Sequence, residues 1–424
     1  MVDLGSLNLE IRKGVFNLKS ESYLEEGVPF IRISNIQEEK MDWEDAVFIS
    51  EIENQKEKRT QLFPGDLVFS KIGTIDRVGY LDNTYPVYNM SQNVIGIKFN
   101  DSSKQVLHSK FLKIIFSLNF GKEQLLREAT FQVQPKLTLD NIRNIKIPLP
   151  PLDVQLQVIH AFDKSVLSKS IKETNALDLI KSVDENIAQK IGFEFPKVDV
   201  KNVFSVKVSA FESRLDPHFY LPNFKALLDN IRKTKNAQLG ELIEFSKETW
   251  NQKDSFENEF PYIEISEIDL SSGKINNVSM VLISEAPSRA KMVVRTNDII
   301  VSTTRPYRGA ISLIDAEKDG NIASTGFAIL RNLKTDSISK EYLFYILRTQ
   351  ICLQQMLQRS SGGSYPAITA EELRNIYIPI PDKAIQQEVV NDIKAFIEKA
   401  EQLKADAKTD FENAKQEIEA LILY

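Results

Sequence analysis

Two stretches of this chain place basic and hydroxyl side chains directly after a short apolar run, and they stand 232 positions apart. The first stretch spans residues 70–77 and the second spans residues 302–309. Arginine and lysine suit guanine edges or phosphates, and serine and threonine suit phosphate oxygens, so this chemistry is that of nucleic-acid contact. The candidate residues are Ser70, Lys71, Thr74 and Arg77 in the first stretch and Thr303, Thr304, Arg305, Tyr307 and Arg308 in the second. The alternative interpretation is that they are solvated charges on two hairpins.

A second pair of polar segments, residues 130–136 and 360–366, precedes a proline-rich block in each half of the chain. Small residues and glycine let backbone N–H groups approach a phosphate closely, and glutamine suits adenine. The candidates here are Gln132, Gln134, Lys136, Ser361, Gly362, Gly363, Ser364 and Tyr365. A flexible linker would have a similar composition.

A third pair of candidates is polar and lies just before a predicted strand. It consists of Gln92 and Asn93 in the first half and Thr325 in the second. Such residues are also common in plain turns, so this pair is the weakest of the three predictions.

The polar segments recur because the sequence around them recurs, at a constant offset of 231 to 232 positions. Residues 29–36 (PFIRISNI) return as 261–268 (PYIEISEI), 65–70 (GDLVFS) as 297–302 (NDIIVS), and 141–150 (NIRNIKIPLP) as 372–381 (ELRNIYIPIP). A period this long indicates two copies of a whole domain and its connector, not a solenoid. A pseudo-dimer within one chain suits a partner that has its own approximate two-fold symmetry, and duplex DNA is the commonest such partner.

Each copy has the pattern of a mixed α/β domain. Residues 31–36 alternate apolar and polar side chains, and residues 66–70 form a short apolar run, so both segments predict strands. Residues 110–118 predict a helix, as do residues 222–231 before the second copy. Residues 145–151 alternate again and then stop at prolines, which indicates a domain boundary.

A long helix is predicted after each domain. Residues 152–190 contain no proline or glycine and carry apolar residues at helical spacing, and residues 389–421 repeat this pattern with one phase slip. A helix of about 38 residues would measure about 57 Å, which is longer than such a domain is wide. We therefore expect the two helices to pack antiparallel on each other; the alternative is that each packs only on its own domain.

The predicted fold class is therefore α+β, with two similar mixed α/β domains joined by two long antiparallel helices. We expect the first domain at 1–150, the first helix at 151–192, a lead-in and second domain at 193–381 with its core at about 237–381, and the second helix at 382–424.

Bulk composition excludes several classes of protein. The single Cys352 rules out a disulfide framework, and the three histidines are too few for a structural zinc site. The net charge of −6 argues against a free-standing, non-specific nucleic-acid binder. No apolar run approaches the length of a membrane span and no signal peptide is evident, so we expect a cytoplasmic protein without a membrane partner.

Motifs of enzymes were sought and not found. The chain has no Asn/Asp-Pro-Pro-aromatic methylase motif, no phosphate-binding G-x-x-x-x-G-K-[ST] loop, no G-x-G-x-x-G and no H-E-x-x-H. We therefore expect a DNA-reading protein without catalytic residues. Two alternatives stay open: a stand-alone nucleic-acid enzyme with an unrecognised site, and a coiled-coil adaptor that binds only proteins.

The doubled blocks, in fixed order and each followed by a long helix, resemble the specificity subunits of type I restriction-modification systems over essentially the whole chain. Residues 214–220 (RLDPHFY) also resemble the segment that introduces a target recognition domain in that family, although here they precede only the second copy.

The resemblance implies two target recognition domains, each reading one half of a bipartite site in double-stranded DNA, with the helix pair as a ruler for the spacer. It implies a subunit that does no chemistry and docks two modification (methyltransferase) subunits, which carry S-adenosylmethionine and methylate adenine. Restriction and translocase subunits, with ATP and Mg²⁺, are an open further partner. No cofactor is expected in this chain itself.

Overall fold

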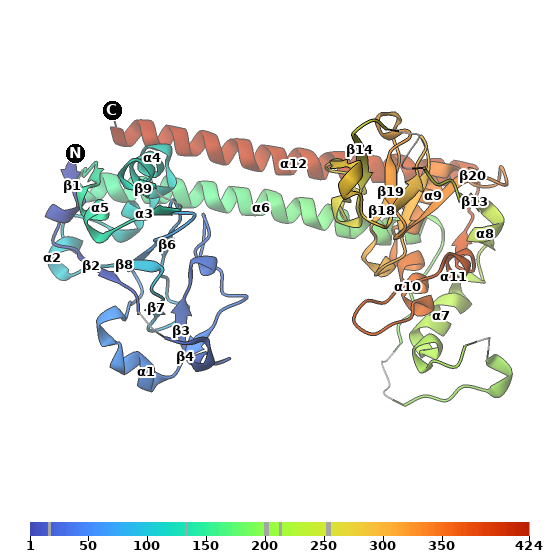
Figure 1. Cartoon of the computed structure of the whole chain (residues 1–424), viewed down its shortest axis with the longest axis horizontal. Helices are drawn as coiled ribbons and strands as arrows, with labels where there is room; N and C mark the ends of the chain where they lie inside the picture. The colour runs from blue at the N-terminus through green and yellow to red at the C-terminus, as the bar shows by residue number, and fades with distance from the viewer. Residues whose placement is uncertain (16–17, 132–133, 199–202, 212–213, 252–255, 424) are drawn as a thin grey trace. The chain divides into compact units, whose positions relative to one another are not determined.

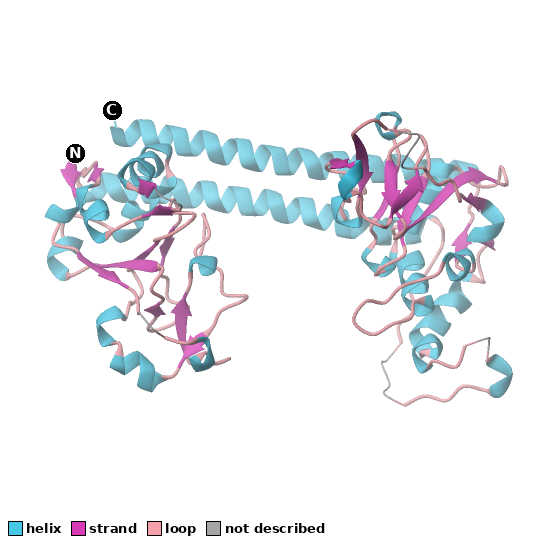
Figure 2. Ribbon diagram, viewed as in Figure 1, coloured by secondary structure: helices cyan, strands magenta, loops and turns pink. Residues whose placement is uncertain are grey.

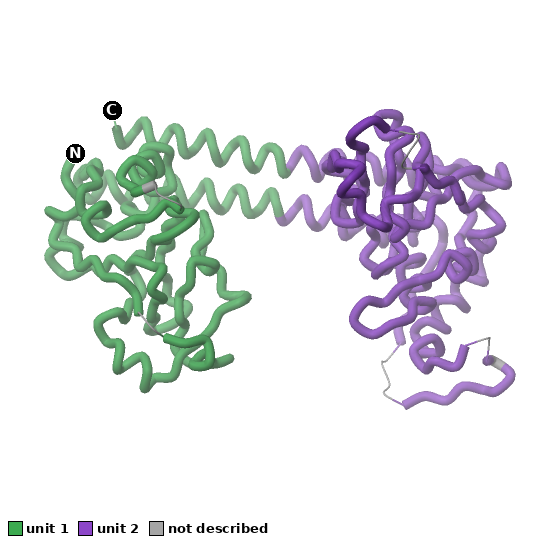
Figure 3. The backbone as a smooth tube through the Cα atoms, in the orientation of Figure 1, with its two compact units in different colours: residues 1–173, 404–424 green, residues 174–403 purple. Residues whose placement is uncertain are grey.

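The computed structural model describes residues 1–15, 18–131, 134–198, 203–211, 214–251 and 256–423. The chain divides into two compact units, shown in green and purple in Figure 3. Unit 1 consists of Met1–Glu173 and Lys404–Tyr424, and unit 2 consists of Thr174–Leu403. Each unit therefore combines one globular domain with a part of both long helices, and the domain limits expected from the sequence stay a prediction.

The two long helices are α6 (Leu152–Lys190) and α12 (Lys383–Leu423), and each is continuous. In unit 1 the ring of Phe162 lies 5.7 Å from the ring of Phe411. In unit 2 Lys190, at the end of α6, pairs with Asp392 near the start of α12 at 3.0 Å. The expected antiparallel packing of the helices is thus present in each unit (Figure 1). The apolar stripes of both helices also join the domain cores, so each helix packs on its domain as well.

Unit 1 contains a four-stranded sheet in the order β2-β8-β5-β6, a three-stranded sheet β4-β3-β7, and the pairs β1-β11 and β9-β10. Its strands are β1 (Val2–Asp3), β2 (Glu10–Lys13), β3 (Val28–Ile31), β4 (Phe48–Ile49), β5 (Leu67–Ser70), β6 (Val78–Tyr80), β7 (Asn89–Met90), β8 (Val94–Lys98), β9 (Thr130–Phe131), β10 (Pro135–Lys136) and β11 (Lys146–Ile147). Its shorter helices are α1 (Glu51–Lys56), α2 (Asp101–Lys104), α3 (Ser109–Ser117), α4 (Asn119–Glu128) and α5 (Leu139–Asn144).

Unit 2 repeats this plan with the sheets β13-β20-β17-β18 and β15-β14-β19-β16 and the pair β12-β21. Its strands are β12 (Asn236–Gln238), β13 (Ile243–Phe245), β14 (Glu259–Ile263), β15 (Ser279–Leu282), β16 (Ala290–Val293), β17 (Ile299–Ser302), β18 (Ile311–Leu313), β19 (Ile322–Ser324), β20 (Phe327–Leu333) and β21 (Tyr377–Pro379). Its shorter helices are α7 (Pro222–Ile231), α8 (Leu239–Leu242), α9 (Lys340–Leu347), α10 (Gln350–Arg359) and α11 (Ala370–Arg374).

The duplication extends to strand register. Leu67 of β5 faces Ile97 of β8, and the corresponding Ile299 of β17 faces Leu330 of β20. Figure 2 shows helices and strands mixed within each unit. The predicted α+β class with two similar domains and two long helices is confirmed.

A buried glutamine in each copy holds the start of the long helix against its domain. The side-chain oxygen of Gln155 accepts from the backbone N–H of His108 at 2.8 Å, and its amide donates to the carbonyls of Val106 and Pro150. Gln386 makes the same set of bonds with Ser339, Ser337 and Pro381. The two buried glutamines bond to backbone groups at equivalent places, and these bonds tie the start of each long helix to its domain.

One strand prediction was wrong. The alternating segment 31–36 leaves the sheet after Ile31, and Ile33–Asn35 forms a 3₁₀ helix. In this copy the side-chain oxygen of Asn35 accepts from the backbone N–H of Arg32 at 2.8 Å, and its amide donates to Asp42 O, so side-chain bonds stabilise the turn. The second copy turns in the same place, at Ile265–Glu267.

The helix predictions fared better. The helix predicted at 110–118 is α3, one residue earlier at each end, and that predicted at 222–231 is α7 with the same bounds. Among the described residues, no helix combines the length and the apolarity that crossing a bilayer requires.

Candidate nucleic-acid interface

The three polar segments predicted in the first half meet at one junction in unit 1. The backbone N–H of Lys71 donates to Asn93 O at 2.9 Å, and the N–H of Leu137 donates to Lys71 O at 2.9 Å. The N–H of Gly73 donates to Pro135 O at 3.1 Å. The end of β5 therefore holds the segments around residues 92–93 and 134–137 on either side of it, although each had been selected separately from the sequence.

Unit 2 builds the same junction from different residues. Thr303 N–H donates to Gly326 O at 2.8 Å, and Ile368 N–H donates to Thr303 O at 2.9 Å. Arg305 N–H donates to Pro366 O at 2.7 Å, in the place of the Gly73 bond. The same pattern of backbone bonds thus occurs in both units although their side chains differ.

Two predicted contact residues of unit 1 point inward. Ser70 is fully buried and its hydroxyl donates to the carbonyl of Thr74. Lys71 is 7% exposed, and its Nζ donates to Gln92 O at 3.0 Å. Burial lowers the pKa of Lys71, and the nearby Lys13 and Lys136 lower it further. The structure gives both residues a part in positioning the loops.

The other predicted residues of unit 1 form the outer side of the junction. Thr74, Gln92, Gln134 and Lys136 are exposed, and Arg77 and Asn93 are half-buried. Arg77 and Thr74 line a cavity of about 280 Å³ together with Glu38 and Lys122. Gln132 lies outside the described residues.

Arg305 is the most constrained of the predicted residues in unit 2. Its backbone is left-handed, with φ 48° and ψ 51°, at the position that Gly73 occupies in unit 1 with φ 80°. Its guanidinium donates to Ser364 O at 2.9 Å and lies 4.2 Å from the centre of the Tyr365 ring. A non-glycine residue held in this region costs free energy, and such strain gathers at functional sites.

The remaining residues of unit 2 surround Arg305. Arg308 and Thr325 are exposed, as is the segment from Ser361 to Tyr365, whereas Thr304 and Tyr307 are half-buried. Thr303 is committed to the junction through its hydroxyl, which donates to Gly326 O at 2.9 Å. The outer surface thus offers guanidinium, hydroxyl, aromatic and backbone N–H groups, which suit phosphates and base edges.

A cavity of about 310 Å³ in unit 1 adjoins the junction and adds residues that the sequence analysis missed. Arg32 and Ser34 line it together with Gln92 and Asn93. The sequence carried one signal for this site: within the repeated block, Arg32 is replaced by Glu264 in the second copy.

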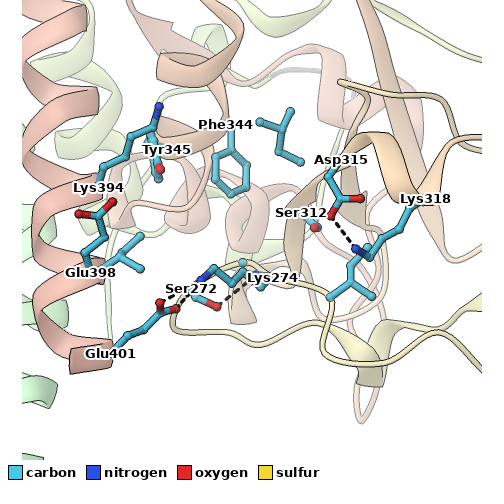
Figure 4. Close-up of a pocket in the computed structure, with 14 residues that line it drawn as sticks. Ser272, Lys274, Ser312, Asp315, Lys318, Phe344, Tyr345, Lys394, Glu398 and Glu401 are labelled. Atoms are coloured by element: carbon cyan, nitrogen blue, oxygen red, sulfur yellow. Dashed lines mark hydrogen bonds and ion pairs between the residues drawn. The ribbon is translucent and has the colours of Figure 1, made fainter. Parts of the chain in front are cut away.

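A larger cavity, of about 460 Å³, lies in unit 2 between the domain and α12 (Figure 4). The ion pairs Lys274–Glu401 (2.7 Å) and Lys318–Asp315 (2.6 Å) stand at its walls, and Lys394 pairs with Glu341 at 2.9 Å. None of the predicted contact residues lines it. Because neighbouring carboxylates pair with these lysines, we interpret the cavity as part of the packing between the domain and α12.

A family model described as the type I restriction modification DNA specificity domain matches the chain twice, over residues 3–182 and 232–410. The chain belongs to this family. Each match covers one domain and much of the long helix that follows it, so the resemblance inferred from the repeated blocks is confirmed. Members of the family are DNA-recognition components of type I restriction-modification systems.

Relatives of this specificity-domain protein include two from Methanocaldococcus jannaschii. The type I restriction enzyme MjaVIII specificity subunit is 24% identical over 320 residues, which is 74% of this chain and 69% of that protein. The putative MjaX specificity subunit is 23% identical over 409 residues, 94% of this chain and 86% of that protein. The HindI specificity subunit of Haemophilus influenzae is 26% identical over 135 residues, which span only 29% of its length.

A solved chain, from work on complex assembly and conformational transition of the type I R-M system, shares the fold of this specificity-domain protein. It superposes with a TM-score of 0.56 at 17% identity, covering 98% of this chain and 96% of the other. In the described part of the chain, no group of three or more His, Cys, Asp or Glu side chains is placed to hold a metal ion.

Proposed function

We propose that this chain is the DNA-recognition subunit of a type I restriction-modification complex and reads a bipartite duplex target, one half-site per unit. The observation that carries the proposal is the doubled junction. The same backbone bonds present three loops in each unit, while the side chains on those loops differ between the units. A target with two different half-sites requires two recognition domains that share a backbone scaffold and carry different side chains on it.

The proposal assigns no chemical step to this chain. The methyl transfer to adenine belongs to two modification subunits that carry S-adenosylmethionine, and ATP and Mg²⁺ belong to a restriction subunit where one joins. The loop residues support this assignment, because exposed arginine, threonine and glutamine side chains make contacts without needing a perturbed pKa.

Docking of a partner subunit is supported by apolar side chains that α6 leaves uncovered. Leu156, Leu167 and Ile171 of unit 1 are each more than half exposed. Apolar side chains repeated along one helix are a typical contact for a partner helix. We assign them to a modification subunit.

The long helices supply the proposed ruler. Both α6 and α12 contribute residues to both units, and we propose that their length sets the spacer that the complex tolerates. Inserting one heptad into each helix should lengthen the tolerated spacer and leave both half-sites unchanged. A spacer preference that ignores helix length would refute the ruler.

The direct test is a map of methylated adenines in cells with and without this chain, supplied with its modification subunits. We expect methylation within one bipartite motif that disappears when the chain is deleted. Methyl transfer or cleavage by the isolated chain would instead favour an enzyme. A complex that modifies DNA without sequence preference would favour a protein adaptor.

A residue-level test uses Arg308→Ala in unit 2. We expect a loss of about 1 to 3 kcal/mol in binding, confined to one half-site, because a base-reading arginine contributes about that much. Arg232→Ala is the matched control, since Arg232 is an exposed arginine of the same unit at the end of α7, where it lies 5.5 Å from the ring centre of Tyr377 and is not a predicted contact residue. An equal effect of Arg308→Ala on both half-sites would refute the two-reader arrangement.

A further inference from the structure

The cavity beside the unit 1 junction has the form of a recognition site. Its volume is about 310 Å³, and Tyr23 and Phe30 line it with ring centres 5.8 Å apart. Arg32, Ser34, Gln92 and Asn93 add guanidinium, hydroxyl and amide groups to the same lining. The lining is therefore largely polar, and guanidinium, hydroxyl and amide groups are the ones that recognise base edges and phosphates.

We propose that Arg32 is a specificity-determining residue for the half-site that unit 1 reads, and that this cavity receives the base-edge groups it recognises. The inference rests on the proposed function, which it deepens by naming a residue outside the loops predicted from the sequence.

The cavity and the junction are one continuous surface. Lys71 binds two successive carbonyls of the segment that lines the cavity, Gln92 O through its Nζ and Asn93 O through its N–H. Ser91, just after β7, donates its N–H to Ile31 O at 2.9 Å, next to Arg32. DNA that contacts Gln92 and Asn93 therefore lies against the cavity that Arg32 lines.

The side chain of Arg32 is held in place by one hydrogen bond of its guanidinium. Its Nη2 donates to Asp45 O at 2.5 Å, and its Nε is buried without a hydrogen-bond partner among the described residues. An arginine fixed in this way loses little conformational entropy on binding, and the donors that remain on Nη1 and Nη2 suit the acceptors of a guanine edge.

The second copy shows that Arg32 is not needed to build this turn. Unit 2 makes the same 3₁₀ turn with Glu264 in its place, 3.7 Å from Arg289. There the ring centre of Trp250 lies 4.6 Å from that of Phe260, whereas unit 1 pairs Tyr23 with Phe30. The backbone is kept while charge and aromatic packing change, as is expected where two readers must differ.

The test uses the reconstituted complex with its modification subunits and a panel of duplexes that carry every single-base change in each half-site. Arg32→Glu, Arg32→Ala and Arg32→Lys are compared with wild type. We expect Arg32→Glu and Arg32→Ala to lose about 10- to 100-fold of discrimination at one or two adjacent positions of the first half-site, with the second half-site unchanged. Arg32→Lys should keep the charge and lose part of the discrimination, because lysine cannot make the bidentate contact.

The matched control is Arg12→Ala, because Arg12 is an exposed arginine on β2 of the same unit, paired with Glu10 at 2.8 Å. Thermal melting of each variant separates a folding defect from a reading defect, and Arg32→Lys keeps the test valid if Arg32→Glu does not fold. An unchanged preference profile, or an equal loss of affinity for all sequences, would overturn the role of Arg32. A wild-type complex that discriminates at neither half-site would overturn the proposed function itself.

Discussion

Units 1 and 2 share a pattern of backbone hydrogen bonds but differ in the charged side chains at equivalent positions. The bond from Gly73 to Pro135 recurs as that from Arg305 to Pro366, with only hydrogen-bonding backbone atoms in common. By contrast, the ion pair between α3 and α6, Lys110–Asp163, recurs between α9 and α12 as Glu341–Lys394 with the charges reversed. The comparison teaches that the scaffold is fixed by main-chain bonds, which leaves the surface free to change its chemistry.

The same contrast runs through the interior. Lys113 on α3 is 5% exposed, donates to Glu38 O at 3.1 Å and lies 5.1 Å from the ring centre of Phe162. The matching position on α9 is Phe344. Unit 1 therefore carries a buried charge where unit 2 has an aromatic ring, and this difference is open to measurement.

The largest effect is expected from the shared glutamines. Gln155→Ala and Gln386→Ala should each lower the free energy of unfolding of their own unit by about 3 kcal/mol, because each loses three hydrogen bonds that contribute about 1 kcal/mol apiece. Chemical denaturation of the full chain, followed by probes in each unit, measures the two costs. Gln157→Ala and Gln387→Ala, at exposed positions of the same helices, serve as controls. Widely unequal costs would show that the two joints are not equivalent.

The second prediction concerns pH and distinguishes the units. Burial lowers the pKa of Lys113 from 10.5 to about 8, so the folded state disfavours its charged form. Unfolding takes up a proton between these values, and the stability of unit 1 should therefore rise by about 3 kcal/mol as pH rises from about 8 to 10.5.

Lys113→Met should remove this rise, as measured by denaturation across the pH range. The difference between wild type and variant isolates Lys113 from groups such as Lys169, whose pKa is raised and whose contribution is lost at high pH. Lys104→Met, at an exposed position on α2, is the control. A variant that keeps the full pH dependence would contradict this account.

The sequence predicted those parts of the fold that depend on periodicity. Apolar spacing gave the long helices and α7, and the repeated blocks gave two similar domains. It could not predict the turn at Ile33–Asn35, because the bonds from Asn35 that bend the chain are not visible as a pattern of apolar and polar residues.

The candidate site was predicted only in part, for a related reason. The residue types of the polar loops predicted them as contact segments. That the loops lie together could not be predicted, because it depends on backbone pairing between distant segments, such as Thr304 with Ala367. The inward positions of Ser70 and Lys71 follow from the same pairings. Arg32 was not predicted because it lies inside a repeated block, where the similar flanking residues indicate a structural role and the change to Glu264 is the one sign of a different function.

A third prediction tests the strained position that the two junctions share. Gly73→Ala should destabilise unit 1 by about 1 kcal/mol, because φ is +80° there although space around the new Cβ is open. Gly363→Ala is the matched control, since it also has open space but no left-handed φ. Arg305→Gly should leave the stability of unit 2 within about 0.5 kcal/mol, because relief of backbone strain offsets the lost contact with Tyr365. A loss from Gly363→Ala as large as that from Gly73→Ala would remove backbone strain as the cause.

The smallest effect is expected from reversing the charges of the ion pair between α3 and α6. Lys110→Glu or Asp163→Lys alone should cost about 0.5 kcal/mol, since both side chains of the pair are partly exposed. The double variant, which copies the polarity of Glu341 and Lys394, should recover most of that loss in a double-mutant cycle of unfolding free energies. Full recovery would mean that only the presence of a pair matters at this joint. A double variant less stable than either single one would show that the residues around this pair in unit 1 favour one polarity. The freedom to change charge would then apply to the loops and not to the contact between α3 and α6.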